Sequence, residues 1–166
     1  MDKVSLDRIK TAHPKLREEL LSLYKKANNQ LGANVRLRLA YVYRSPAEQD
    51  ALFKLRPKVT NSKAWQSIHN YGLAFDIVLL IDKDNNGTFE TAEWNTIKDF
   101  DGDKIADWME VVKVFKDAGW VWGGDWKSFK DAPHFEKTYG FNWQVLKQRF
   151  DKGLTIQDNG ITYPKI

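Results

Sequence analysis

Two histidines and one aspartate form the combination in this sequence that is best suited to chemistry. His69 stands just before an apolar segment, Asp76 lies inside that segment, and His134 follows far downstream. A carboxylate among apolar neighbours is costly to bury unless it is paired or bound to a metal. Gly72 permits a turn that would bring His69 back toward Asp76. Two histidines and one carboxylate, with a fourth position left for water, make up a catalytic zinc site.

Each of these residues also has a plainer interpretation. A histidine beside a strand is usually a hydrogen-bonded structural residue, and a buried aspartate is more often a cap or an ion-pair partner. The sequence has no cysteine and three histidines, so any metal must be held by histidine and carboxylate groups. The third histidine, His13, precedes Pro14 at the entrance of an expected helix, and we expect it at the surface. From the residue types alone, both interpretations stay open.

The proton-transfer group of such a site could be either of two carboxylates that flank His134. Glu136 would share one face of a strand with His134, whereas Asp131 stands three residues before it at a loop end. Arg44 follows an expected strand. Its guanidinium could hold a substrate carboxylate or the charge that grows on a carbonyl oxygen, and a surface ion pair is the alternative. Ser67 could bind a substrate backbone or cap a turn.

An acidic segment after the apolar run matches the twelve-residue calcium-binding loop. Oxygen donors stand at positions 1, 3, 5, 9 and 12, with Gly87 at position 6 and the backbone carbonyl of Thr88 as a further donor; the side-chain donors are Asp82, Asp84, Asn86, Glu90 and Glu93. The alternative is a plain acidic hairpin, because Asn86-Gly87 is also a strong hairpin-turn signal. A second acidic cluster comprises Asp99, Asp101, Asp103 and Asp107. It matches the loop less well, because Lys104 stands where the loop glycine would be. The alternative is that these residues cap the helix expected near Ile105.

The elements that would position these residues follow from the spacing of apolar side chains. Helical spacing predicts helices over 14–31, from about 45 to 55, from 105 to about 115 and over 142–150, the second opening with a capping box at Ser45 and Glu48. Strands are predicted at 35–41, 73–81, 120–122 and 134–137, with a loop over 56–67. Helices and strands do not alternate regularly, which indicates α+β. We expect one domain over residues 1–166, built on a small, mostly antiparallel sheet flanked by helices.

The composition predicts a folded, soluble chain with a mildly basic surface. Hydrophobic residues make up 42% and aromatic residues 13%, and the formal net charge is +4. A positive balance favours approach to anionic polymers, although a solvated surface of mixed charge is the simpler interpretation. No nucleic-acid-binding motif and no membrane-spanning apolar run is present, and the first residues do not resemble a signal peptide. We expect a monomer made in the cytoplasm without a signal peptide, with neither nucleic acid nor membrane as a partner.

Two separated motifs carry a family resemblance. Ser67-x-His69-x-x-Gly72-x-Ala74-x-Asp76, followed by Asp131-x-x-His134, resembles the zinc peptidases that include D-alanyl-D-alanine carboxypeptidases and L-alanyl-D-glutamate endopeptidases. The similarity runs from about residue 39 to residue 143. The segment from Trp122 to Phe129, leading into His134, looks most like the L-alanyl-D-glutamate branch, which is known from phage endolysins and bacterial autolysins.

The resemblance implies a Hedgehog/D,D-peptidase-like fold and a set of residue roles. Zinc would be held by His69, Asp76 and His134, Asp131 would be the acid/base, and Arg44 would bind the substrate or its developing charge. The substrate would be the peptide stems of bacterial peptidoglycan, most directly the L-alanyl-D-glutamate bond, so the protein would act on the cell wall. A D-alanyl-D-alanine carboxypeptidase and a non-catalytic cell-wall binding module of the same fold are the alternatives.

Overall fold

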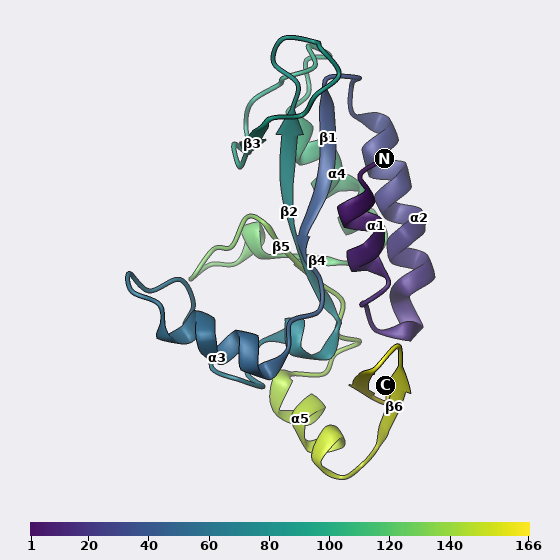
Figure 1. Cartoon of the computed structure of the whole chain (residues 1–166), viewed down its shortest axis with the longest axis vertical. Helices are drawn as coiled ribbons and strands as arrows, with labels where there is room; N and C mark the ends of the chain where they lie inside the picture. The colour runs from purple at the N-terminus through teal and green to yellow at the C-terminus, as the bar shows by residue number, and fades with distance from the viewer.

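A five-stranded sheet with one long central strand organises the fold (Figure 1). The computed structural model describes residues 1–166. The central strand β2 (Ala74–Ile81) pairs with β1 (Val35–Tyr41), with the short β3 (Thr91–Glu93) and with β5 (His134–Glu136), and β5 pairs with β4 (Val121–Trp122). Every pairing is antiparallel. The expected α+β class with a small antiparallel sheet is confirmed.

The two faces of β2 have different neighbours, and this difference positions the candidate site. Phe75, Ile77 and Leu79 belong to the main hydrophobic core, together with side chains of α2 (Pro14–Gln30) and α4 (Asp107–Asp117). Successive side chains of a strand point to opposite faces of the sheet. Asp76 therefore points away from the helical core, and its side chain keeps 20% of its surface exposed.

Most predicted elements are present with nearly the expected bounds. The strand predicted at 73–81 is β2, and the capping box at Ser45 and Glu48 opens α3 (Pro46–Lys54). The last predicted helix is α5 (Trp143–Asp151), which Asn142 caps by accepting a hydrogen bond from the backbone of Val145. Two short 3-10 helices, η1 (Ile68–Tyr71) and η2 (Gly123–Asp125), lie within segments that carry the sequence motifs.

Elements at the two ends of the chain were not predicted. Helix α1 (Lys3–Ile9) packs on β1, and a hairpin of β6 (Thr155–Asp158) and β7 (Ile161–Pro164) follows α5. The prediction that His13 lies at the surface was wrong, because its side chain is buried: Nε2 lies 2.8 Å from the carbonyl oxygen of Pro164, and Nδ1 accepts from the backbone of Lys15. His13 thus joins the start of α2 to the C-terminal hairpin.

None of the helices combines the length and the apolar character needed to cross a lipid bilayer.

Candidate metal centre and active site

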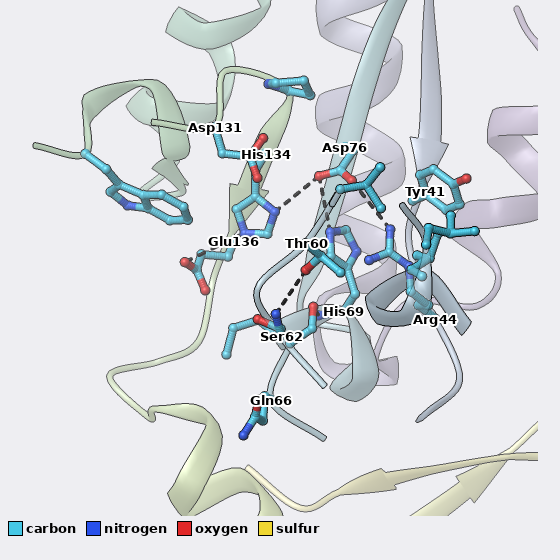
Figure 2. A pocket seen from close by; sticks show the side chains of 17 residues that line it. Tyr41, Arg44, Thr60, Ser62, Gln66, His69, Asp76, Asp131, His134 and Glu136 are labelled. Atoms are coloured by element: carbon cyan, nitrogen blue, oxygen red, sulfur yellow. Dashed lines mark hydrogen bonds and ion pairs between the residues drawn. The ribbon is translucent and has the colours of Figure 1, made fainter. Parts of the chain in front are cut away.

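The structure brings His69, Asp76 and His134 together around one carboxylate oxygen (Figure 2). Nε2 of His69 and Nδ1 of His134 each lie 3.2 Å from Oδ1 of Asp76. The two imidazole rings are 5.1 Å apart, centre to centre. Two nitrogens and one carboxylate oxygen that converge in this way, at the edge of a pocket, fit the donor set that zinc takes in catalytic sites.

Local backbone structure explains why the three side chains meet. Asp76 and His134 are directly opposite one another in the antiparallel β2–β5 pair, so their side chains lie on the same face of the sheet. His69 lies on η1, which Gly72 ends in the left-handed conformation with φ at 70°. A side chain at Gly72 would also meet the backbone of His13, so the turn that returns His69 to Asp76 requires glycine.

A hydrogen bond on its far side fixes the orientation of the His69 ring. Its Nδ1 lies 2.8 Å from the carbonyl oxygen of Val42, which can only accept, so Nδ1 carries the proton there. The other nitrogen, Nε2, is then free to bind a metal. A ligand histidine that donates its second nitrogen to a carbonyl is typical of protein metal sites, because that bond fixes both tautomer and ring angle.

The charges of the site are tightly linked. Burial alone would raise the pKa of the Asp76 carboxyl, but the adjacent His69 and His134 outweigh burial and hold that pKa well below its usual range. Burial alone would lower the pKa of the His134 imidazole, but hydrogen bonds with Asp76 and Glu136 raise it to about 9. These shifts favour an ionised Asp76 beside a protonated His134.

Arg44 lies beside the candidate metal-binding group formed by His69, Asp76 and His134. Its Nη2 is 3.8 Å from Oδ2 of Asp76, and its Nη1 donates to Oε1 of the fully buried Gln49 at 3.1 Å. The side chain is largely buried, and its Nε has no hydrogen-bond partner. This geometry argues against the surface ion pair that the sequence left open. An ordered guanidinium at the pocket wall can bind an anionic group.

The two candidate proton-transfer groups lie on either side of His134. Asp131 precedes β5, and both it and Glu136 line the same pocket as the metal-binding group (Figure 2). Burial and the neighbouring Asp76 raise the pKa of the Asp131 carboxyl, as suits a group that must accept and return a proton near neutral pH. Glu136 instead lies 3.7 Å from Nε2 of His134, where it supports that ring.

The lack of a side chain at Gly123 allows the backbone of Asp131 to pack against it. The backbone N–H of Asp131 donates to the carbonyl oxygen of Gly123 at 3.0 Å, and a Cβ at position 123 would overlap the carbonyl oxygen of Asp131. The glycine that directly follows Trp122 thus lets the η2 turn approach the loop that precedes His134.

Ser67 caps the turn that carries His69. Its hydroxyl oxygen accepts from the backbone N–H of His69 at 3.3 Å, and its side chain lines the pocket. The capping interpretation thus has a direct contact, and the pocket position leaves the hydroxyl within reach of a ligand.

An open pocket of about 540 Å³ surrounds the metal-binding group. Segments far apart in the sequence form its walls, including the loop from Val59 to Ile68, the end of α3 and Trp126. Trp126 packs against the ring of His134 with 5.3 Å between ring centres. No pattern in the sequence marks Gln49, and Trp126 stands only within the segment 122–129 that resembles the L-alanyl-D-glutamate branch.

The predicted calcium loop is only partly assembled as expected. One oxygen each from Asp82, Asp84 and Glu90 lie within 4.8 Å of one another, whereas Glu93 does not join that group and instead pairs opposite Leu79 in β3. Asn86 directs its side-chain oxygen to Thr88 within the loop. Both oxygens of Asp82 accept backbone N–H groups of the loop.

Two histidines and an aspartate beside a buried arginine, in an open pocket of an antiparallel sheet, form a side-chain set that could support metal-dependent hydrolysis. Comparison with known proteins finds a similar family. Residues 60–137, which contain all three candidate metal ligands, match the peptidase M15 family described as D-alanyl-D-alanine carboxypeptidase. This match agrees with the family that the two sequence motifs resemble.

Two individual proteins resemble the chain. It is 42% identical over 99 residues to the peptidoglycan L-alanyl-D-glutamate endopeptidase CwlK of Bacillus subtilis (strain 168), over 57% of this chain and 56% of that protein. The chain thus spans only about half the length of that relative. The crystal structure of the Serratia marcescens L-Ala D-Glu endopeptidase ChiX matches with a TM-score of 0.55 and 23% identity, covering 84% of this chain and 90% of that chain. This second likeness confirms the expected fold.

Proposed function

We propose that the protein is a zinc-dependent peptidase that cleaves the L-alanyl-D-glutamate bond in the peptide stems of bacterial peptidoglycan. The observation that carries the proposal is the convergence of His69, Asp76 and His134 on one point, with Asp131 in the same pocket. The identity to CwlK, which is named as an endopeptidase for that bond, supports the choice of substrate. The site of action would be the bacterial cell wall.

Each residue of the pocket has a role in this proposal. Nε2 of His69, Nδ1 of His134 and a carboxylate oxygen of Asp76 would hold zinc, since these atoms already face one another. When bound there, zinc would lower the pKa of a water molecule and polarise the scissile carbonyl. Asp131 would take the proton of the attacking water and give it to the leaving amine. Arg44 would hold an anionic group of the substrate or the developing oxyanion, and Ser67 would bind the stem backbone.

Digestion of purified peptidoglycan tests the proposal. Mass spectrometry of the products should reveal new L-Ala carboxyl termini and new D-Glu amino termini. Release of free D-Ala from otherwise intact stems would instead establish the carboxypeptidase alternative. Binding to the wall without any new termini, by a protein that contains its zinc, would establish the non-catalytic alternative.

Metal analysis tests the ligand set independently of activity. The purified protein should contain about one zinc ion per chain, and the double variant His69→Ala with His134→Ala should contain none. His13→Ala is a suitable comparison, because it removes the third histidine, which lies outside the pocket. Full zinc occupancy in the double variant would overturn the assignment.

Calcium at the loop 82–93 remains a second, separate prediction. Asp82, Asp84 and Glu90 would supply carboxylate oxygens, and Asn86 and Thr88 would complete the coordination. Glu93 would have to leave its position opposite Leu79 to take part. Asp82→Ala together with Glu93→Ala should abolish any rise in melting temperature that this loop gives with calcium, and the zinc content should stay unchanged.

A further inference from the structure

A buried carboxylate at the start of α4 lacks half of its expected partners. Asp107 is completely buried, with 0% of its surface exposed. Its Oδ2 accepts the backbone N–H of Phe100 at 2.6 Å, but its Oδ1 has no hydrogen-bond partner. A buried carboxylate oxygen without a partner is destabilising unless a cation is present. The metal-binding pocket does not include this residue.

Four more carboxylates surround Asp107. One oxygen each from Asp101, Asp107 and Glu110 lie within 4.8 Å of one another, and a second such group shares Asp101 and adds Asp99 and Asp103. Oε2 of Glu110 is also buried without a hydrogen-bond partner. None of the five carboxylates forms a salt bridge with lysine or arginine. Five acidic groups are therefore close together without any compensating side chain.

The electrostatic consequence is visible in two of these groups. Burial and the nearby Asp103 and Asp101 raise the pKa of the Glu110 carboxyl to about 7. Burial and Asp101 likewise raise the pKa of Asp107 to about 6. Both groups would be held in their charged form far more readily with a bound cation, because an opposite charge within a few ångströms favours ionisation.

The spacing of the five carboxylates agrees with that of a cation-binding loop. Counted from Asp99, they fall at positions 1, 3, 5, 9 and 12, the side-chain positions of the twelve-residue calcium loop. The residue at position 6 is Lys104, which weakened the match in the sequence. In the structure Lys104 has φ at 80°, the left-handed conformation that glycine gives such a loop. The glutamate at position 12, Glu110, completes the pattern.

We propose that Asp99, Asp101, Asp103, Asp107 and Glu110 bind one calcium ion, at a site separate from the proposed zinc centre. An all-oxygen donor set in an irregular loop suits calcium, which accepts six to eight oxygen ligands with flexible geometry. The same set suits zinc poorly, because it offers no histidine or cysteine to accompany the carboxylates. The ion would bind Oδ1 of Asp107 and Oε2 of Glu110, the two buried oxygens that have no hydrogen-bond partner.

The site would join three parts of the fold. Asp107 and Glu110 belong to the first turn of α4. Oδ2 of Asp101 accepts the backbone N–H of Gly32 at 2.7 Å, and the side chain of Asn34 donates to the carbonyl oxygen of Phe100 at 2.8 Å. Gly32 and Asn34 form the turn between α2 and β1. A bound ion would thus tie the loop to the start of α4 and to that turn, so its effect should appear as stability of the whole fold.

Titration calorimetry and thermal unfolding of the zinc-loaded full chain test the proposal. Calcium chloride should bind with one ion per chain at this site and raise the melting temperature, whereas magnesium chloride should bind more weakly. Asp107→Asn with Glu110→Gln keeps the side-chain shapes and removes two charges, and it should weaken this binding about a hundredfold or more. Asp82→Asn with Asp84→Asn, in the neighbouring acidic loop, is the matched control and should retain the binding event at Asp107.

The outcomes separate this proposal from the others. Absence of calcium binding to the unmodified protein up to about 10 mM, above the range of weak extracellular sites, would overturn it. Calcium binding that survives Asp107→Asn with Glu110→Gln but is lost in Asp82→Asn with Asp84→Asn would overturn it too, since the ion would then occupy the other loop. If the first double variant does not fold, Glu110→Gln alone serves, because that side chain is only partly buried. Unchanged zinc content in every variant keeps this result independent of the proposed peptidase activity.

Discussion

Zinc binding should depend steeply on pH because of one proton on His134. In the structure, Oδ1 of Asp76 lies 3.2 Å from Nδ1 of this ring and Oε1 of Glu136 lies 3.7 Å from Nε2. These two carboxylates raise the pKa of His134 to about 9 against the opposing effect of burial. A ligand histidine must be neutral. Zinc must therefore displace a proton at any pH below about 9.

The size of the effect follows from that pKa. Since the free protein holds the proton and the zinc complex does not, the apparent affinity falls about tenfold for each pH unit below 9. At pH 7 the affinity should be about a hundredfold below its limiting value in alkali, which corresponds to about 2.7 kcal/mol. A histidine with the ordinary pKa of about 6.5 would give almost no change over the same interval.

Competition with a chromogenic zinc chelator, from about pH 6.5 to 9.5 at constant ionic strength, measures how the affinity for zinc changes with pH. The expected change is about tenfold for each pH unit below 9. Glu136→Gln is the informative variant, because it removes one of the two carboxylates that raise the pKa of His134. The pH at which the affinity levels off should move downward in that variant. An affinity for the unmodified protein that stays flat between about pH 7 and 9 would refute the reasoning, because His134 would then be neutral in the free protein.

Three further predictions concern the groups around the site and the N-terminal helix. Asp131→Asn should retain zinc and lose turnover by roughly a hundredfold or more, whereas Glu136→Gln should stay active at saturating zinc. If instead Glu136→Gln is inactive and Asp131→Asn is active, Glu136 is the base. Gly123→Ala should lower the melting temperature by forcing a Cβ against the carbonyl oxygen of Asp131, a crowding that costs roughly 1–3 kcal/mol, and it should reduce turnover more than zinc content. Asp2→Asn should destabilise the fold by roughly 1–3 kcal/mol at neutral pH, because the carboxylate accepts from Ser5 and pairs with Arg38. Although burial opposes the shift, these partners lower the pKa of Asp2 in the folded state, so its contribution is present above its unfolded pKa of about 4 and should vanish as the pH falls below it. Denaturant unfolding of both proteins across that pH range measures the difference.

Local patterns in the sequence were sufficient to predict the elements at the centre of the fold. The run from Leu73 to Ile81 is apolar because β2 is buried on both faces, and Asp76 differs because it is the one residue of β2 that lines the pocket. The capping box at Ser45 and Glu48 forms as expected, because both of its hydrogen bonds are local. The proposed zinc ligands could not be selected from local pattern alone. Residue types suggested them, and two motifs at fixed spacing selected them.

Features that depend on contacts between distant segments could not be predicted. Helix α1 has seven residues and relies on Asp2, which bonds to Arg38 of β1; a helix this short is marginal without such packing. His13 was expected at the surface, but the C-terminal hairpin covers it. Gln49 orients Arg44 from inside α3, a role that no sequence motif marks.

The register of the central strands separates the proposed zinc centre from the proposed calcium site at Asp107. At one end of the β1–β2 pair, Tyr41 lies opposite Asp76, beside the proposed zinc centre; at the other end, Val35 lies opposite Ile81. The turn that precedes Val35 bonds to the acidic loop through Gly32 and Asn34. From Asp76 to the end of β2 the strand extends for five residues, which is about 17 Å. Charges this far apart are largely screened at physiological salt. Calcium at the acidic loop should therefore affect the zinc centre through the stability of β2 and not through its charge.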